Sequence, residues 1–129
     1  MARKNPVTRE NPAKLERDLM RGAGPVAVLK VLAGGKRYGY ELVKALAQES
    51  GGALAMGQST LYPMLYNLEA QGYLRAEWET GESARERKYY SLTAKGKRRL
   101  EKQTEQWRTV VEGMTNLGVL ARSGGEVGA

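Results

Sequence analysis

The sequence predicts a mainly α-helical domain with one small β-hairpin, an α+β fold class. Apolar residues recur at helical spacing through most of the 129-residue chain. Past the middle of the chain, apolar residues recur at every second position, which is typical of strands buried on one side. The 16 glycines fall mostly between these segments, where they indicate turns. One domain of ordinary size can hold all of these elements.

The first third of the chain predicts two short helices, over about residues 12–22 and 25–33. Each begins with a proline in its first turn, after Asn11 in one case and after Gly24 in the other. The second helix is apolar on most sides, so we expect it at the buried centre of the domain. The first helix carries a single apolar stripe made of Leu15, Leu19 and Met20.

Two further helices are expected over about residues 41–48 and 59–71, the first of them preceded by a basic loop at Lys36 and Arg37. The second has Pro63 in or next to its first turn, where a missing N–H costs little. Its leucines recur at helical spacing and are expected to pack inward. They are Leu61, Leu65 and Leu68.

Residues 74–79 alternate between apolar and charged side chains, which predicts a half-buried strand. Residues 87–92 predict a second strand, and the polar loop between the two strands contains a glycine, so the strands should form a hairpin. We expect Tyr90 and Leu92 to pack this hairpin against the helices. The apolar face of the first strand is expected to consist of Leu74, Ala76 and Trp78.

Thr93 is the expected N-cap of a long helix over about residues 94–116. In that helix Leu100, Trp107 and Val111 recur at helical spacing. Helices followed by a two-stranded hairpin and then a long helix have the order of a winged helix-turn-helix domain with an appended helix.

The composition excludes most catalytic and metal-binding chemistry. The chain has no cysteine and no histidine, and Asp18 is its single aspartate. Disulfides, thiolate or imidazole metal sites, Ser-His-Asp catalysis and aspartate-based metal loops therefore cannot be built. We expect neither an enzyme nor a cofactor. No apolar run reaches the roughly 18 residues of a membrane span, and no apolar signal segment is present, so a cytoplasmic protein with no membrane partner is expected.

Positive charge is concentrated in one stretch of the chain. The formal net charge is +7, and from Arg85 to Arg99 there are seven basic residues against Glu86 alone. Lysines and arginines that displace counterions from phosphates are the main source of affinity for nucleic acids. A solvated surface that keeps the protein soluble is the alternative, and charge by itself does not separate the two.

Four motifs in order along residues 24–114 resemble the PadR family of bacterial transcriptional regulators. They are YGYEL at 38–42, STLYPML at 59–65 with Leu68, Glu69 and Gly72, RKYYSLT at 87–93 with Gly96, and Trp107 in the last helix. The resemblance implies a homodimeric DNA-binding repressor of the small subfamily, which has a single C-terminal helix.

The expected elements and the resemblance together give each part of the chain an expected role. From their composition, residues 1–10 should be a flexible basic tail, and residues 118–129 a second flexible tail. Residues 11–93 should form the winged helix-turn-helix DNA-binding domain, and residues 94–117 the dimerisation helix. Within the DNA-binding domain, the recognition helix is expected at about 59–71 and the wing at about 74–92.

The recognition helix should lie in the major groove with its polar face toward the bases. That face is made of Ser59, Thr60, Tyr62, Pro63, Tyr66 and Asn67. It has no lysine or arginine, so much of the affinity must come from elsewhere. The expected contributors are Lys36, Arg37, Tyr38 and Tyr40 before the preceding helix, and Arg85, Arg87 and Lys88 on the wing. For Tyr38 and Tyr40, packing within the fold is as good an interpretation as DNA contact.

The long helix carries an apolar surface that one small domain does not cover. Pairing of two copies about a two-fold axis would bury it. Such a dimer presents its recognition helices about 34 Å apart and reads an inverted-repeat operator in double-stranded DNA. The expected interface residues are Leu15, Leu19 and Met20 of the first helix, and Trp107, Val110, Val111, Met114 and Leu117 of the last.

Some relatives in the small subfamily bind flat hydrophobic molecules between paired tryptophans of this helix. Trp107 resembles that position, which implies a small hydrophobic or phenolic effector; plain packing in the dimer is the alternative. The leading hypothesis is therefore a homodimeric, sequence-specific repressor released by a small molecule. The other hypothesis is a winged helix that serves as a protein–protein module or as a non-specific architectural DNA binder.

Overall fold

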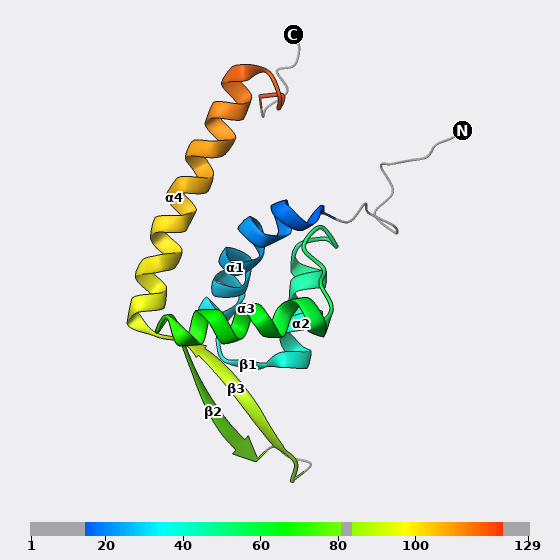
Figure 1. The fold of residues 1–129 in the computed structure, drawn as a ribbon, viewed down its shortest axis with the longest axis vertical. Coiled ribbons are helices and arrows are strands. Elements are labelled where there is room, and N and C mark those ends of the chain that lie inside the picture. Colours follow the sequence, from blue (N-terminus) through cyan, green and yellow to red (C-terminus); the bar gives the residue numbers. More distant parts are fainter. Residues whose placement is uncertain (1–14, 81–83, 123–129) are drawn as a thin grey trace, which may run out of the picture.

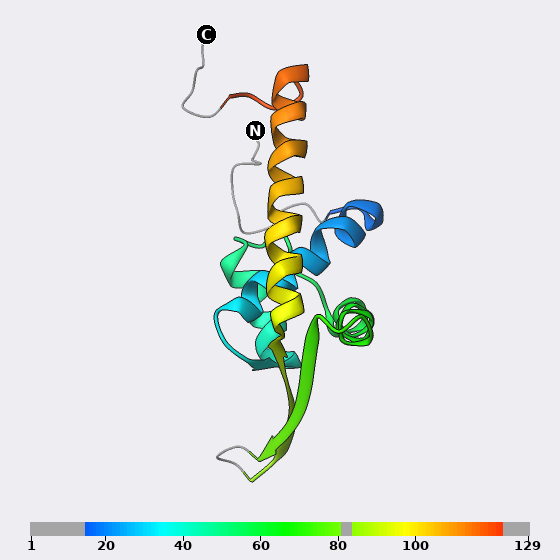
Figure 2. The same ribbon diagram turned by 90° about the vertical axis from the view of Figure 1, so that its left-hand side faces the viewer.

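The computed structural model describes residues 15–80 and 84–122 of the chain. In chain order, its elements are α1 (Arg17–Ala33), β1 (Arg37–Tyr38), α2 (Gly39–Glu49), α3 (Gln58–Ala70), β2 (Leu74–Thr80), β3 (Glu86–Leu92) and α4 (Ala94–Leu117). The β2–β3 hairpin and α4 extend in opposite directions from the cluster of the other three helices (Figures 1 and 2). The α+β class and the winged-helix order expected from the sequence are confirmed.

Helix α1 is continuous where the sequence predicted two helices. It runs from Arg17 to Ala33 with Pro25 inside it. An internal proline removes one backbone hydrogen bond and costs about 3 kcal/mol. Val28 and Leu29, in the turn after the proline, are fully buried in the core. Burial of such side chains contributes about 1.5–3 kcal/mol each, which offsets the proline. The helix start expected at residues 11–12 lies outside the described residues.

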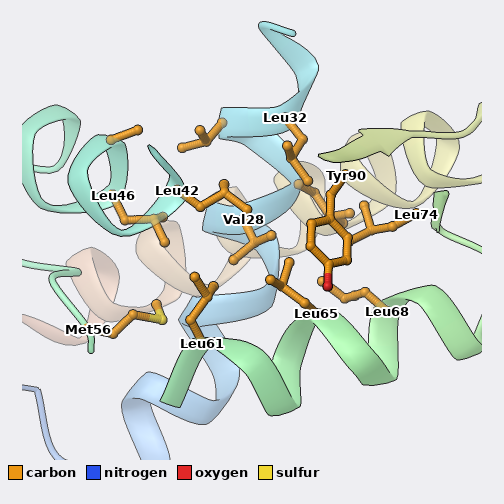
Figure 3. Close-up of a cluster of buried hydrophobic side chains, with 13 residues drawn as sticks. Val28, Leu32, Leu42, Leu46, Met56, Leu61, Leu65, Leu68, Leu74 and Tyr90 are labelled. Atoms are coloured by element: carbon orange, nitrogen blue, oxygen red, sulfur yellow. The ribbon is translucent and has the colours of Figure 1, made fainter. Parts of the chain in front are cut away.

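The core lies where α1, α2 and α3 meet the base of the hairpin (Figure 3). The inward-facing leucines of α3 are buried, and Tyr90 closes the core from β3, both as predicted. Leu92 is partly buried against the same cluster. The largest fully buried side chains are Val28, Leu29, Leu42, Leu46, Leu61 and Leu65.

The sheet has one strand more than the sequence predicted. β3 lies between β1 and β2 and pairs antiparallel with both. β1 is only the dipeptide Arg37–Tyr38, which pairs with Tyr90 and Tyr89 of β3. The prediction of a loop at this point was wrong, because two residues are too few to show the alternation by which a strand is recognised.

The hairpin extends past the helices, so the burial predicted for its outer half was wrong. Leu74 is buried and Ala76 is half-buried, whereas Trp78 is 64% exposed. The alternation in the sequence therefore gives the two faces of β2 correctly, but the outer half of the hairpin extends away from the helices of the described chain (Figure 1).

Hydrogen bonds fix the start of α4 to the end of α3. Thr93 caps α4 as predicted, since its Oγ1 accepts from the backbone N–H of Gly96 at 2.9 Å. The same hydroxyl donates to the carbonyl of Gly72 at 2.7 Å. The Lys95 ammonium donates to the carbonyl of Gln71 at 2.9 Å. The direction in which α4 leaves the domain is thus set by the C-terminal end of α3.

Helix α4 ends in a hydrogen-bonded turn. Gly118 has a φ of 90°, and the N–H groups of Val119 and Leu120 both donate to the carbonyl of Met114. The tail predicted from residue 118 therefore starts with ordered backbone, and its last seven residues lie outside the described part, as does the tail predicted over residues 1–10. In the described ranges, no helix combines the length and the apolar character needed to cross a membrane.

Candidate nucleic-acid interface

Helix α3 presents a polar face to solvent, on the side opposite its three buried leucines. It spans Gln58–Ala70, one residue earlier at each end than predicted. Tyr66 is the more exposed of its two tyrosines, at 74%. All six residues predicted for the DNA-reading face are exposed: Ser59, Thr60, Tyr62, Pro63, Tyr66 and Asn67.

One flank of this face is held against α2 by Tyr62. A Cβ atom on Gly39, the first residue of α2, would lie 2.1 Å from the Tyr62 hydroxyl oxygen. Only glycine therefore allows the tyrosine ring to lie over the start of α2. The side chain of Tyr62 is still 42% exposed, so it both packs against α2 and faces outward.

The other flank of α3 lies beside the first turns of α1. A groove of about 600 Å³ there is lined by Arg17 and Arg21 of α1 together with Ser59, Thr60 and Asn67 of α3. Neither arginine was among the DNA contacts predicted from the sequence. Their spacing of four residues places them on one helix face, but only the packing of α1 beside α3 brings that face next to the exposed face of α3.

Three of the cations predicted to contact phosphates form ion pairs within the chain. All three pairs are at least partly exposed, and exposed pairs contribute only about 0–1 kcal/mol to stability. The hydrogen bond to Glu79 is the main reason that the pKa of Lys36 lies above its ordinary value. The pairs are Lys36 with Glu79 at 2.5 Å, Arg37 with Glu49 at 3.7 Å, and Lys88 with Glu69 of α3 at 3.9 Å.

Tyr38 and Tyr40, for which the sequence left both DNA contact and packing open, lie in different environments. Tyr38 is half-buried: its ring lies 5.4 Å from that of Tyr89, edge to face, and the Arg87 guanidinium lies 4.4 Å from its centre. Tyr38 and Arg87 therefore fix the hairpin to β1. Tyr40 is 55% exposed and Arg85 is exposed, so both are free to meet a partner.

The basic stretch from residue 85 to residue 99 is divided by the fold. Its first three cations lie on the hairpin, and the other four lie in the first turns of α4. Lys95 and Arg99 both lie over the ring of Tyr73, at 5.3 and 5.5 Å. Arg99 also lines a small pocket with Arg21 and Asn67, on the α1 side of α3.

The apolar surface of α4 is exposed in the single chain. Trp107 is half-buried and lines a groove of about 700 Å³ between α1 and α4, together with Ala27, Leu54 and Val111. Among the interface residues predicted near the start of the chain, Leu15, which precedes α1, and Met20 of α1 line the groove beside α3, and Leu19 is 57% exposed. The exposed residues in the second half of α4 are Val110 (44%), Val111 (49%), Met114 (40%) and Leu117 (79%).

Comparison with models of known protein families shows to which family this chain is related. Residues 28–102 match the model of the transcriptional regulator PadR-like family. The chain belongs to the PadR-like family. The matched residues include most of the core, helix α3 and the β2–β3 hairpin, and they end in the first turns of α4. The apolar second half of α4, including Trp107, lies beyond the matched range.

Solved structures of PadR-like regulators have the same fold. A PadR family transcriptional regulator from Eggerthella lenta is 39% identical, with a TM-score of 0.68 over 78% of this chain and 85% of that chain. A transcriptional regulator from Clostridium thermocellum is 25% identical, with a TM-score of 0.71 over 79% and 96% of the two chains. A protein from Lysinibacillus sphaericus named only as uncharacterized protein X is 27% identical over 95 residues, which are 74% of this chain and 87% of that protein.

Membership of the PadR-like family establishes the class of function. The chain is a DNA-binding transcriptional regulator with a winged helix-turn-helix domain, and it is not an enzyme. The exposed polar face of α3 lies between the arginines of α1 and the start of α2, with the hairpin near its C-terminal end, and is the surface that suits this function best.

Proposed function

We propose that this PadR-like regulator is a cytoplasmic, homodimeric repressor that binds an inverted-repeat operator and releases it when a small hydrophobic molecule binds. The observation that carries the proposal is the exposed face of α3, which is polar and uncharged, with cations beside it. A surface of this kind can hydrogen-bond to base edges while the cations on its flanks contact phosphates.

In the proposed complex, α3 lies in the major groove and reads the operator directly. Asn67 can donate to and accept from an adenine edge, and Thr60 can do either with any base. The tyrosine ring of Tyr66 offers apolar contact to thymine methyl groups, and its hydroxyl can reach phosphate. Because α3 contains neither arginine nor lysine, the bidentate arginine–guanine contact is absent from this helix. We therefore expect A·T pairs at the positions that α3 reads.

The phosphate contacts come from both flanks of α3. Arg17 and Arg21 face one strand from α1, and the wing reaches the other strand with Arg85, Arg87 and Lys88. The internal ion pair of Lys88 is weak enough to be exchanged for a phosphate. Lys36 and Arg37, which precede α2, also form partly exposed ion pairs that a phosphate can replace. Tyr40, near them in the chain, is exposed.

The double substitution of Arg17 and Arg21 by alanine is expected to lower affinity for any duplex and to flatten its salt dependence. Each phosphate contact adds about 0.9 to the slope of log K against log salt concentration, so the slope should fall by about 1.8. Fluorescence anisotropy at several salt concentrations measures both quantities. Lys102→Ala, which removes an exposed cation from α4, is the matched control and should leave the slope unchanged. If the double variant has the same slope as the wild type, these arginines do not contact the DNA phosphates.

The dimer is proposed to form through α4. The exposed apolar residues in its second half have no cover in a single chain, and pairing about a two-fold axis would bury them. The same pairing places two copies of α3 about one DNA turn apart, as an inverted repeat requires.

The groove at Trp107 is the proposed effector site. Its volume of about 700 Å³ lies within the range of small-molecule pockets, about 300–1,000 Å³, and its lining is mostly apolar. Planar hydrophobic drugs or phenolic acids are expected to quench tryptophan fluorescence and to release the operator. The Trp107→Ala variant keeps Trp78 as its tryptophan and should show neither effect. Equal quenching in the variant and the wild type would leave Trp107 with a packing role in the dimer.

The proposal is tested by comparing two duplexes, the DNA upstream of the gene for this chain and a random sequence of the same length. Affinity for both should fall by powers of ten between about 50 and 200 mM salt. The upstream DNA should remain preferred by a factor of about 10³ or more. Equal affinity for the two duplexes would indicate a non-specific architectural protein instead of a repressor.

A further inference from the structure

Trp78 is a large apolar side chain of the hairpin that lies outside the core formed by the described residues. It lies in the outer half of β2 and is 64% exposed. The exposed indole ring leaves a large apolar area in water, and covering that area with a partner would be favourable.

The strand register shows which way Trp78 faces. Leu74 pairs with Leu92 and Ala76 pairs with Tyr90, and these residues form the face of the hairpin that packs on the helices. Trp78 pairs with Lys88, the next position on the same face. Side chains of directly paired residues lie on one side of a sheet, so Trp78 continues this face beyond the edge of the core.

This face of the hairpin adjoins α3. Tyr90 is buried at the C-terminal half of α3, as Figure 3 shows, and Lys88 forms an ion pair with Glu69 of that helix at 3.9 Å. In Figure 2, where α3 is seen end-on, the hairpin extends below it. A duplex seated on the exposed face of α3 would lie beside the face of the hairpin that carries Trp78.

We propose that Trp78 is a DNA contact, with its indole packed against the deoxyribose of the strand that borders the groove occupied by α3. An indole suits this position because its rings cover the apolar side of the sugar and its N–H can donate to a phosphate oxygen. Every nucleotide offers the same sugar and phosphate, so the contact adds affinity without reading sequence. This inference rests on the proposed position of α3 in the major groove.

The first test compares Trp78→Ala with the wild type on the upstream duplex and on the random duplex. The alanine variant should bind both duplexes about tenfold more weakly, with an unchanged ratio between them. Its slope of log K against log salt concentration should be that of the wild type, because no charge is removed. Arg85→Ala is the contrasting variant on the same hairpin, and it should reduce that slope by about 0.9. Trp78→Phe keeps a ring and should fall between alanine and the wild type.

The second test measures access to the indole. Acrylamide should quench tryptophan fluorescence less in the DNA complex than in the free wild-type protein, and Trp78→Phe should show no such difference. An alanine variant that binds both duplexes as the wild type does would overturn the proposal. Protection of Trp78 already in the free protein would also overturn it, since the cover would then be protein. If the wild type itself binds neither duplex, the proposed function fails and this contact fails with it.

Discussion

Replacing Val111 by glutamate is expected to convert the regulator to a monomer at micromolar concentration and to weaken operator binding at least a hundredfold. Val111 lies in the apolar second half of α4 and is 49% exposed in the single chain. In a two-fold dimer the substitution would bring two carboxylates into a mostly apolar contact. Taking each charge out of water costs several kcal/mol, which is enough to separate the subunits.

Light scattering gives the mass of the variant, and anisotropy gives its affinity for the operator. The matched control is Thr109→Glu, which adds the same charge to an exposed position on the opposite side of the same helix. The control should remain a dimer and bind as the wild type does. A Val111→Glu protein that is still a dimer would show that the two copies meet through another surface.

Replacing Gly96 by alanine is expected to destabilise the fold by about 3 kcal/mol, because overpacking against rigid backbone cannot relax cheaply. Gly96 is buried in the first turn of α4. A Cβ atom there would lie 2.2 Å from the carbonyl oxygen of Tyr73 and 2.8 Å from a methyl group of Leu92. To make room, α4 would have to move away from the segment between α3 and β2, and the hydrogen bonds of Thr93 would be lost with it.

Gly113→Ala is the matched control, because it makes the same change in the same helix. Gly113 is exposed, and a Cβ atom there would meet nothing within 4 Å. Alanine is favoured over glycine inside a helix by about 0.8–1.0 kcal/mol, so this variant should be more stable than the wild type. Urea unfolding of both variants at one protein concentration measures the two effects. Destabilisations of equal size would show that the close approach at Gly96 does not matter.

Where elements are long and packed on one side, the sequence predicts them well. The leucines of α3, the hairpin strands, and Thr93 as the cap of α4 follow from local patterns that the tertiary structure only reinforces. Pro25 shows the limit of such patterns. A proline after a glycine is typical of a helix start, but the burial of Val28 and Leu29 holds one helix together across it.

The candidate site could be predicted in part. The exposed face of α3 follows from helical spacing, because the residues opposite its leucines must face outward. Arg17 and Arg21 could not be assigned, since nothing local indicates that α1 passes beside α3. The ion pair of Lys36 with Glu79 joins residues 43 positions apart, and a local sequence pattern does not reveal a contact over that separation. The family match adds the class of function but ends at residue 102, before the surface proposed for dimerisation.

In the proposed complex, two copies of α3 are held one DNA turn apart by α4 and read two half-sites of one operator. Footprinting the upstream DNA locates the protected sequence, and five base pairs are then inserted at its centre. Half a turn of DNA places the second half-site on the opposite side of the duplex. The insertion should reduce affinity to that of random DNA. Undiminished binding to the altered operator would show that the two copies of α3 do not read half-sites at a fixed spacing.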